Sequence, residues 1–567
     1  MLNKIKFTKN QEVSHQGTSS LCRRRAWQSQ GTKILAQVNR VRRPQRWDAA
    51  FGRERIHPDW VNLILSSQIL GDINPADFPD DLSLADIVTN DCAIKWCSRG
   101  EIVYAAGSYQ TSIFVVLNGG VRVSDDAGTD HAGEPTAMPQ LNAWLSPLLK
   151  GKFGRGESNV TRFPTVRLGR YEMFGEVEAL TRTPRSNTAV ADVDRTALLE
   201  ITWPGARELL HWSDTFRSSV EELYRARSVE VGLKESGLFA NIDPETLVAI
   251  AQQCSFERHG SFDWSHVYQR ENATRQPSAQ MIEQEPVIIE QGHYLEDMFL
   301  IRAGFARVTE TVHDNESSVG FLESGDVFGL AEIEEGLIFG SHPNAERGLR
   351  SVGYTDLIRI PEHIVGKFIL PGSKRRNRGA APAPGQTPHG DLSLLDFVVD
   401  NRFINATNAM VIDTTRCVGC DDCVRACAAA HDGIPRFVRT GRTHANLMVT
   451  SACMHCTDPV CLIDCPTGAI HRDAFSGSVV INDDTCIGCA TCSSACPYNN
   501  IQMREVTGPD GAILIDEDGS THLKATKCDL CAGQSGGPAC QRACPHDALT
   551  RIDIRDIDIL SDRQSRV

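Results

Sequence analysis

The sequence of 567 residues contains no run that approaches the length of about 18 apolar residues that a membrane-spanning helix needs. Its start lacks the apolar core of a secretory signal, because no apolar run follows Arg23, Arg24 and Arg25. The net charge of −14 argues against nucleic acid as the main partner. With neither an anchor nor an export signal, we expect a cytoplasmic protein, in a reducing compartment where thiols serve as metal ligands.

Acidic residues are nearly absent from residues 1–50, where only Glu12 and Asp48 accompany eleven lysines and arginines. We expect residues 1–60 to form a basic arm without fixed structure, because such a composition buries little apolar surface. Organellar transit peptides share this composition, and the arm is also the candidate for contact with nucleic acid. A solvated tail is the interpretation we favour.

Cysteine is scarce before residue 400, where Cys22, Cys92, Cys97 and Cys254 show no spacing that suits a metal. The other sixteen of the 20 cysteines form four groups of four. Groups one and three have the spacing C-x2-C-x2-C-x3-C, whereas the second gap widens to four residues in group two and to eight in group four. The groups are Cys417, Cys420, Cys423 and Cys427; Cys453, Cys456, Cys461 and Cys465; Cys486, Cys489, Cys492 and Cys496; and Cys528, Cys531, Cys540 and Cys544.

This spacing suits iron–sulfur clusters. Three thiolates two residues apart can hold three irons of one cubane, and the fourth cysteine typically opens a helix that carries it to a neighbouring cluster. Pro466, Pro497 and Pro545 follow the fourth cysteines of groups two to four and suit the first turn of such a helix. Structural zinc would use two C-x2-C pairs about 15–20 residues apart, and a disulfide scaffold would need an oxidising compartment. We therefore expect iron–sulfur ligation.

Residues 408–555 resemble the iron–sulfur subunits of the DMSO-reductase and formate-dehydrogenase type, with the groups in the same order and the long gap in the fourth. The resemblance implies a double bacterial-ferredoxin-like domain with four [4Fe–4S] clusters, because group two keeps all its cysteines. It also implies that groups one and four, and groups two and three, exchange their fourth ligands. The implied ligand sets are Cys417, Cys420, Cys423 and Cys544; Cys528, Cys531, Cys540 and Cys427; Cys453, Cys456, Cys461 and Cys496; and Cys486, Cys489, Cys492 and Cys465.

A module of this kind passes single electrons and has no catalytic residue of its own. No Rossmann glycine fingerprint or other cofactor motif stands out elsewhere in the chain. We therefore expect the electron-transfer component of an oxidoreductase complex, with a separate catalytic subunit of the molybdopterin, hydrogenase or flavin type, and not a self-sufficient enzyme.

Upstream there is a weak internal duplication. Residues 100–107 lead into 114–123, and residues 286–292 lead into 298–308, each with short β-rich runs between glycine turns. This pattern is typical of a small antiparallel barrel or jelly roll. Apolar positions at helical spacing through 206–233 predict a helical connection, and Asp243 is the expected N-cap of a further helix.

The first repeat contains a glycine turn before a short helix, followed by an arginine nine residues after Glu176. Such a turn offers N–H groups to a phosphate, and arginine offers a planar donor fork. This segment resembles the phosphate-binding cassette of cyclic-nucleotide-binding domains, over about residues 65–230 and more weakly 235–370. The resemblance implies that cAMP or cGMP is held through its phosphate, its ribose hydroxyl and nearby amides by Gly175, Glu176, Val177, Arg185 and Ser186.

Two departures bear on that interpretation. Glu178 places a negative charge where a small residue is usual, and residues 125–165 form an unusually long insertion between strands. The alternative to nucleotide binding is an internal ion pair between Glu176 and Arg185. In the second repeat Leu330 replaces the ribose-binding glutamate, and no arginine follows nine residues later. We expect the second repeat to be structural or to dock a partner.

The expected fold class is a multidomain α+β chain of two β-rolls and a double ferredoxin-like domain. The expected parts are an arm (1–60), a nucleotide-binding domain (61–232) with an insertion (125–165), a degenerate copy (233–370), a linker rich in Pro, Gly and basic residues (371–398), the four-cluster domain (399–557) and a tail (558–567). The expected function is electron transfer under the control of a cyclic-nucleotide sensor. The alternatives are a redox-responsive regulator and a scaffold whose β-rolls only dock partners.

Overall fold

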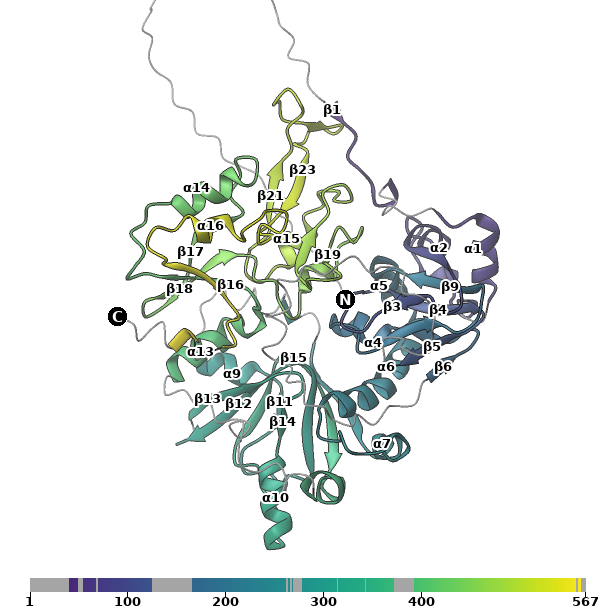
Figure 1. Cartoon of the computed structure of the whole chain (residues 1–567), viewed down its shortest axis with the longest axis vertical. Helices are drawn as coiled ribbons and strands as arrows, with labels where there is room; N and C mark the ends of the chain where they lie inside the picture. Colours follow the sequence, from purple (N-terminus) through teal and green to yellow (C-terminus); the bar gives the residue numbers. More distant parts are fainter. Residues whose placement is uncertain are drawn as a thin grey trace, which may run out of the picture.

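The computed structural model describes residues 40–48, 55–67, 70–124, 166–261, 264–265, 268, 278–313, 315–341, 343–371, 392–556 and 559–561. They form two β-rolls and a cysteine-rich unit (residues 392–556), so the predicted fold class is confirmed. Figure 1 shows the first β-roll on the right, the second at the bottom and the cysteine-rich unit above them. The expected insertion and most of the expected linker lie outside the described residues.

Two four-stranded antiparallel sheets, with the orders β2-β9-β4-β7 and β3-β8-β5-β6, make the first β-roll. Alternate residues of β4 face opposite sides of its sheet, so Phe114 lies between the two sheets while Val115 faces the helices. The ring centres of Phe114 and Phe174 are 5.3 Å apart. The strands are β2 (Cys92–Cys97), β3 (Ile102–Tyr104), β4 (Ile113–Asn118), β5 (Val121–Ser124), β6 (Val166–Leu168), β7 (Met173–Phe174), β8 (Thr188–Ala191) and β9 (Thr196–Ile201). The helices are α1 (Pro58–Leu65), α2 (Leu84–Asp91), α4 (Glu176–Thr181), α5 (Trp203–Trp212) and α6 (Asp214–Glu235).

The predicted helical connection is two helices, α5 and α6, which are separated at Ser213. Ser213 accepts a hydrogen bond from the N–H of Phe216 and thereby caps α6. Asp243 caps α7 (Pro244–Ala251) as predicted, because its carboxylate accepts from the N–H of Thr246 at 2.9 Å.

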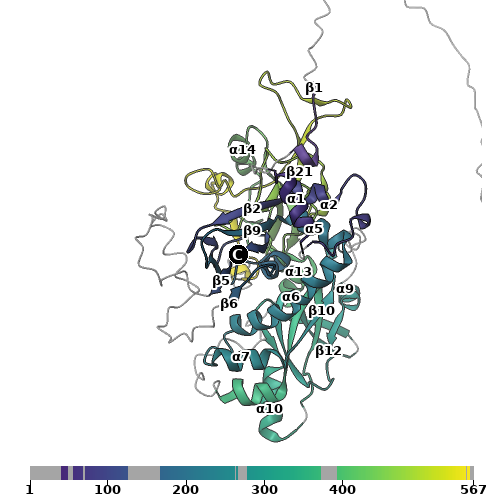
Figure 2. The same ribbon diagram turned by 90° about the vertical axis from the view of Figure 1, so that its right-hand side faces the viewer.

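The second β-roll is built on a six-stranded sheet, in which β10, β15, β12 and β13 lie in that order, β11 pairs with β15 and β14 pairs with β12. Its end farthest from the cysteine-rich unit carries α10 (Figures 1 and 2). The elements are β10 (Ser255–Gly260), α9 (Ser278–Gln284), β11 (Val287–Ile289), β12 (Asp297–Val312), β13 (Asn315–Leu322), β14 (Val327–Phe328), α10 (Leu330–Phe339), β15 (Gly348–Pro361) and α11 (Glu362–Ile364).

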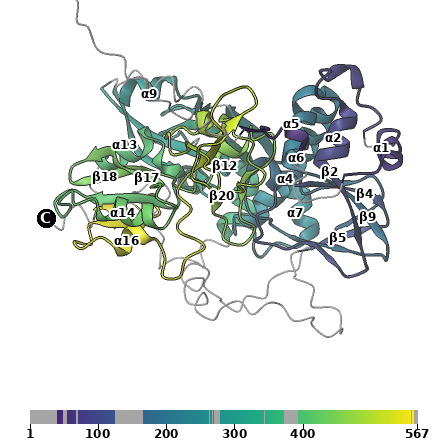
Figure 3. The ribbon, with the colours of Figure 1, turned by 90° about the horizontal axis from the view of Figure 1, so that it is seen from above.

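The cysteine-rich unit consists of small sheets and short helices, with α14 and α16 on the side away from the first β-roll (Figure 3). One sheet has the order β17-β18-β16-β24, and β19-β20 and β21-β23 form separate two-stranded sheets. The elements are α13 (Leu392–Asp400), β16 (Ala409–Asp413), α14 (Asp422–Ala429), β17 (Phe437–His444), β18 (Leu447–Ala452), β19 (Ile470–Arg472), β20 (Val479–Ile481), α15 (Thr491–Ala495), β21 (Gln502–Glu505), β22 (Ile515–Asp516), β23 (Leu523–Thr526), α16 (Ala539–Arg542) and β24 (Leu549–Ile552).

The structure corrects the expected linker at its end, because α13 begins at Leu392. Leu394, Leu395 and Val398 are buried in one core with Phe305 and Val352 of the second β-roll. Apolar residues at helical spacing therefore fasten the cysteine-rich unit to that domain. No helix among the described ranges is long and apolar enough to cross a membrane.

The structure also corrects the expected unstructured arm, because residues 40–48 have a defined structure. Residues 1–39 lie outside the described residues. β1 (Arg40–Val41) pairs in parallel with β22. Arg43 donates to the carbonyl oxygens of Ile487 at 3.1 Å and Gly488 at 2.5 Å. Arg46 forms ion pairs with Asp91 and Glu208 of the first β-roll. Residues 40–48 thus connect the first β-roll to the cysteine-rich unit.

Candidate functional site

The last cysteine of group one lies among the cysteines of group four. Burial raises the pKa of the Cys427 thiol to about 11, and the sulfurs of Cys528 and Cys531 raise it further as near neighbours. Burial likewise raises the pKa of Cys540 to about 12, with the sulfurs of Cys528, Cys427 and Cys531 adding to the effect. The N–H of Arg436 donates to the sulfur of Cys427 at 3.2 Å.

The other cysteines of group one lie near the last cysteine of group four. Cys417 and Cys544 both pack against the hydrophobic cluster that contains Cys423. The N–H of Ala548 donates to the sulfur of Cys544 at 3.3 Å. Cys420 completes this group on the surface.

Group three receives the last cysteine of group two. Burial raises the pKa of Cys492 to about 12, and the sulfurs of Cys465, Cys486 and Cys489 raise it further. α15 holds Cys492 in position, since the helix begins one residue before it. Cys465 is therefore beside the three cysteines that precede α15 or lie in it.

Group two receives the last cysteine of group three. Burial raises the pKa of Cys461 well above its usual value, and the sulfurs of Cys496, Cys453 and Cys456 contribute in the same direction. The N–H of Asn500 donates to the sulfur of Cys496 at 3.4 Å. Of these four residues, Cys453 and Cys496 are buried and Cys456 and Cys461 are half-buried. Cys496 and Cys461 share a hydrophobic cluster with cysteines of the set based on group three.

The four sets suit iron–sulfur clusters on chemical grounds. Buried thiols with raised pKa values stay protonated at neutral pH unless a cation stabilises the thiolate, and iron supplies that positive charge. Backbone N–H groups point at Cys427, Cys496 and Cys544, as expected for sulfur that carries negative charge. Bound clusters would supply one-electron reduction and oxidation.

Exposure differs along the row of ligand sets. Cys420 and Cys489 are exposed, and they belong to the sets based on groups one and three. Each ligand of the set based on group four (Cys427, Cys528, Cys531 and Cys540) is buried, and no ligand of the set based on group two is exposed. The exchanged cysteines set groups one and four side by side, and likewise groups two and three, while Arg551 contacts both Cys528 of group four and Cys453 of group two. The sets therefore follow the order one, four, two and three, with two accessible ends and an enclosed middle.

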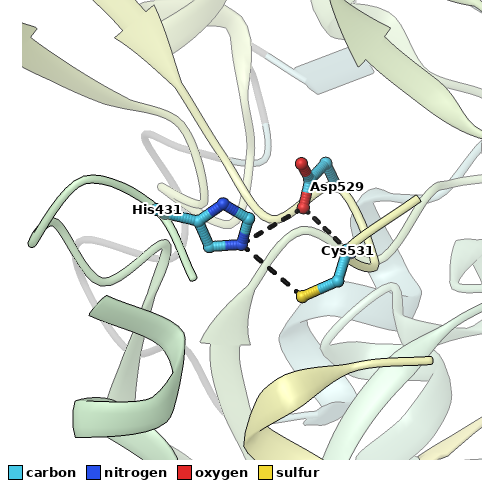
Figure 4. A group of neighbouring side chains, drawn as sticks. All are labelled: His431, Asp529 and Cys531. Carbon is cyan, nitrogen blue, oxygen red and sulfur yellow. Dashed lines mark hydrogen bonds and ion pairs between the residues drawn. The ribbon is translucent and has the colours of Figure 1, made fainter. Parts of the chain in front are cut away.

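His431 and Asp529 lie beside Cys531 (Figure 4). The Nε2 atom of His431 is 3.6 Å from the sulfur of Cys531 and 3.5 Å from a carboxylate oxygen of Asp529. These three side chains could hold an ion by themselves. Because Cys531 belongs to a set of four buried sulfurs, we interpret His431 as a donor to cluster sulfur, and Asp529 also pairs with Arg436 at 2.8 Å.

In the first β-roll, the predicted cassette holds Arg185 in an internal position. Its side chain has no exposed surface, and it donates to the carbonyl oxygens of Gly175 at 2.5 Å and Ser112 at 2.6 Å. Its guanidinium also lies 4.4 Å from the centre of the Tyr104 ring. A Cβ atom on Gly175 would lie 2.7 Å from Arg185 Nη1 and would displace the guanidinium, and the φ of +79° at this position favours glycine.

Glu178 occupies the position that an anion would take beside Arg185. Its carboxylate lies 3.4 Å from Arg185 Nη1 and accepts from the hydroxyl of Ser186 at 2.5 Å and from the N–H of Ser186 at 3.3 Å. Arg185 and Ser186 are thus together as predicted, but they share an internal carboxylate. The sequence indicated Glu178 only as a departure from the family pattern.

Glu176 is fully buried at the start of α4, directly before Val177. Its carboxylate pairs with Arg227 of α6 at 2.9 Å and not with Arg185. Burial raises the pKa of Glu176, and Arg227 opposes that shift. The pair connects the cassette to the long helix between the two β-rolls.

The tip of the cassette contacts a cysteine loop. Arg182 pairs with Asp458, which lies between Cys456 and Cys461, at 2.5 Å. Trp264 of the second β-roll donates its Nε1–H to the other carboxylate oxygen of Asp458 at 3.2 Å. Asp458 therefore joins all three units, and no sequence pattern marked it or Arg182.

The corresponding position in the second β-roll differs as expected. Leu330 follows Gly329, whose φ is +89°, and Arg350 pairs with Glu316 at 2.7 Å. Arg350 also donates to the carbonyl oxygen of Glu285 at 3.0 Å, so its side chain is committed to the sheet.

The cysteine-rich unit is similar in sequence to known iron–sulfur proteins. Residues 444–554 match the model of the 4Fe–4S dicluster domain. The electron transport protein HydN of Escherichia coli is 35% identical over 178 residues, which cover 29% of this chain and 96% of HydN. The chain belongs to the 4Fe–4S dicluster family. Formate hydrogenlyase subunit 2 of Escherichia coli is 33% identical to this dicluster protein, over 29% of the chain and 88% of that subunit.

Solved structures similar to the β-rolls include a regulatory domain of Toxoplasma gondii protein kinase A with cAMP, at 14% identity and a TM-score of 0.20. That similarity covers 56% of the dicluster protein and 95% of the solved chain. A Trypanosoma cruzi regulatory subunit bound to guanosine has 13% identity and a TM-score of 0.20, over 62% and 96% of the two chains. TM-scores this low support no conclusion, so the description of the two β-rolls rests on their strands and helices.

Proposed function

We propose that this chain is an electron-transfer subunit that holds four [4Fe–4S] clusters and exchanges electrons with a separate catalytic oxidoreductase subunit. The observation that carries the proposal is the placement of Cys427 among Cys528, Cys531 and Cys540. Such an exchange of the fourth ligand sets clusters side by side, which single-electron transfer between them requires.

The chain's own residues hold the thiolates, exclude water and select the points of access. The buried middle sets protect their ligands from solvent, whereas Cys420 and Cys489 give two exposed ends. We propose that electrons enter near one of these cysteines and leave near the other. Two separate points of access suit a protein that passes electrons through better than one that stores them.

We propose a partner of the molybdopterin, hydrogenase or flavin type, in the reducing cytoplasm. The names of the relatives, an electron transport protein and a formate hydrogenlyase subunit, support a role within an oxidoreductase complex. The four sulfur sets suit single-electron transfer, which favours a subunit that relies on its partner for the reaction.

The proposal is tested by iron and sulfide analysis of the purified, reduced chain together with electron paramagnetic resonance. We expect about sixteen iron atoms per chain, four for each cluster, and the interacting signals of neighbouring cubanes. Stoichiometric zinc with no iron after anaerobic purification would refute the proposal. Cys254→Ser serves as the control, because this thiol lies outside the four sets.

A second candidate function, control by a cyclic nucleotide, is supported by the contact between Arg182 and Asp458. A nucleotide phosphate would have to displace Glu178 from Arg185 and Ser186. To act as a regulator, the nucleotide must also bind one of two conformations more tightly than the other. Cluster reduction rates measured with and without saturating cAMP or cGMP test it, and equal rates would leave the β-rolls as a scaffold.

A further inference from the structure

Two cationic side chains lie inside the cysteine-rich unit without a carboxylate partner. Lys527 is 3% exposed and donates to the carbonyl oxygens of Val479 and Cys528. Arg551 donates to the carbonyl oxygens of Asn408 at 2.8 Å and Cys453 at 3.1 Å. Within the part of the chain that the structure describes, neither forms an ion pair.

A buried charge without a counter-charge costs several kcal/mol, so two of them in one unit predict an anionic group nearby. Arg472 is a third such cation, because it is 8% exposed, forms no ion pair among the described residues and donates to the carbonyl oxygens of Gly477, Cys456 and Thr457. Two other arginines near the sulfur sets have carboxylate partners. Arg439 pairs with Asp421 at 2.6 Å, and Arg436 pairs with Asp529 at 2.8 Å. The excess positive charge therefore lies on Lys527, Arg551 and Arg472, and Arg551 is the one of these three that donates to a cysteine sulfur.

Both cations lie at the two inner sulfur sets. The Nη2 atom of Arg551 donates to the sulfur of Cys528 at 2.9 Å, and its other amino group reaches the backbone of Cys453. Arg551 thus spans the sets based on groups four and two. The positive charge of Lys527 acts on Cys461, a ligand of the set based on group two.

We infer that Arg551 and Lys527 raise the reduction potentials of the two inner clusters relative to the exposed outer ones. The inference rests on the proposed function. Reduction adds one negative charge to a cluster, and a fixed cation in a low-dielectric site stabilises that added charge. The electron gained at an inner site is lost at its neighbour, and no bond forms or breaks.

This arrangement makes Arg551 and Lys527 positioning residues for electrons. The guanidinium of Arg551 acts mainly on the cluster of Cys528, Cys531, Cys540 and Cys427, because it touches sulfur there. The ammonium of Lys527 acts on both inner sets, since it donates to the carbonyl oxygen of Cys528 and its charge also acts on Cys461. In the partly reduced protein, electrons would occupy the two inner clusters in preference to the two outer clusters.

The test is a redox titration of the full chain followed by electron paramagnetic resonance, with iron content measured in parallel. Arg551→Gln and Lys527→Gln should each make one cluster at least tenfold harder to reduce, a shift of about 59 mV for one electron. Arg551→Lys should keep most of the wild-type potential because it keeps the charge. Arg504→Gln is the control, since its pair with Asp483 lies on the surface.

The outcomes separate this inference from the proposed function. Wild-type protein without [4Fe–4S] signals would remove the proposed function itself. Full iron content with unchanged potentials in both glutamine variants would overturn the role of the two cations alone. Equal shifts in Arg551→Lys and Arg551→Gln would also overturn it, because charge would then not be the cause. If Arg551→Gln fails to fold, Lys527→Gln and Arg551→Lys still decide between these results.

Discussion

The contact between the first β-roll and the cluster loop can be tested by removing Arg182. The side chains of Arg182 and Asp458 are only 4% and 7% exposed, and the guanidinium also donates from Nε at 2.7 Å. Arg182→Met leaves the carboxylate of Asp458 buried, with the Nε1–H of Trp264 as its remaining side-chain donor among the described residues. Removing one partner of a buried pair costs about 3–5 kcal/mol.

The assay is urea unfolding, followed separately by cluster absorbance and by tryptophan fluorescence because a chain of three units need not unfold in one step. We expect Arg182→Met to lower the free energy of unfolding reported by both signals by about 3 kcal/mol, at the lower end of that range. The double variant with Asp458→Leu should recover part of this loss, since no buried charge then remains. Arg225→Met, which breaks an exposed pair with Glu221, should cost at most about 1 kcal/mol. The reasoning fails if Arg182→Met costs no more than Arg225→Met.

Three further predictions concern other parts of the chain. Glu178→Ala should increase affinity for cAMP or cGMP at least tenfold in calorimetry, and equal affinity in both proteins would show that Glu178 does not fill the site. Cys427→Ser should remove the signal of the cluster assigned to Cys528 and spare that of group one; the reverse result would refute the ligand exchange. Burial outweighs Arg46 and raises the pKa of Asp91 from 3.8 to about 6. The contribution of Asp91 to the free energy of unfolding should therefore fall by about 2 kcal/mol as the pH rises from 4 to 6, and the difference between the wild type and Asp91→Asn should show that slope.

The cysteine spacing predicted the four groups because the cysteines of one group lie within a few residues of each other, whereas the exchange of the fourth ligands was implied by the family resemblance. The β-rolls were predictable from the glycine turns and apolar runs for the same local reason. The ion pairs of the cassette were not predictable, since Glu176 pairs with Arg227, which lies 51 residues later, and Arg182 pairs with Asp458, which lies 276 residues later. Such pairs depend on how whole domains pack, and no local pattern signals them. The helix α13 was missed because a basic, proline-rich stretch precedes it.

The tie between residues 40–48 and the cysteine-rich unit has a consequence for the order of synthesis. Arg43 contacts the carbonyl oxygen of Ile487, a residue 444 positions later in the chain. A ribosome that adds about 5–20 residues per second needs roughly 20–90 s to cover that distance. During this interval both β-rolls can fold, while β1 has no strand to pair with. β1 and Arg43 therefore dock only after β22 and the cysteine loop that they contact have emerged.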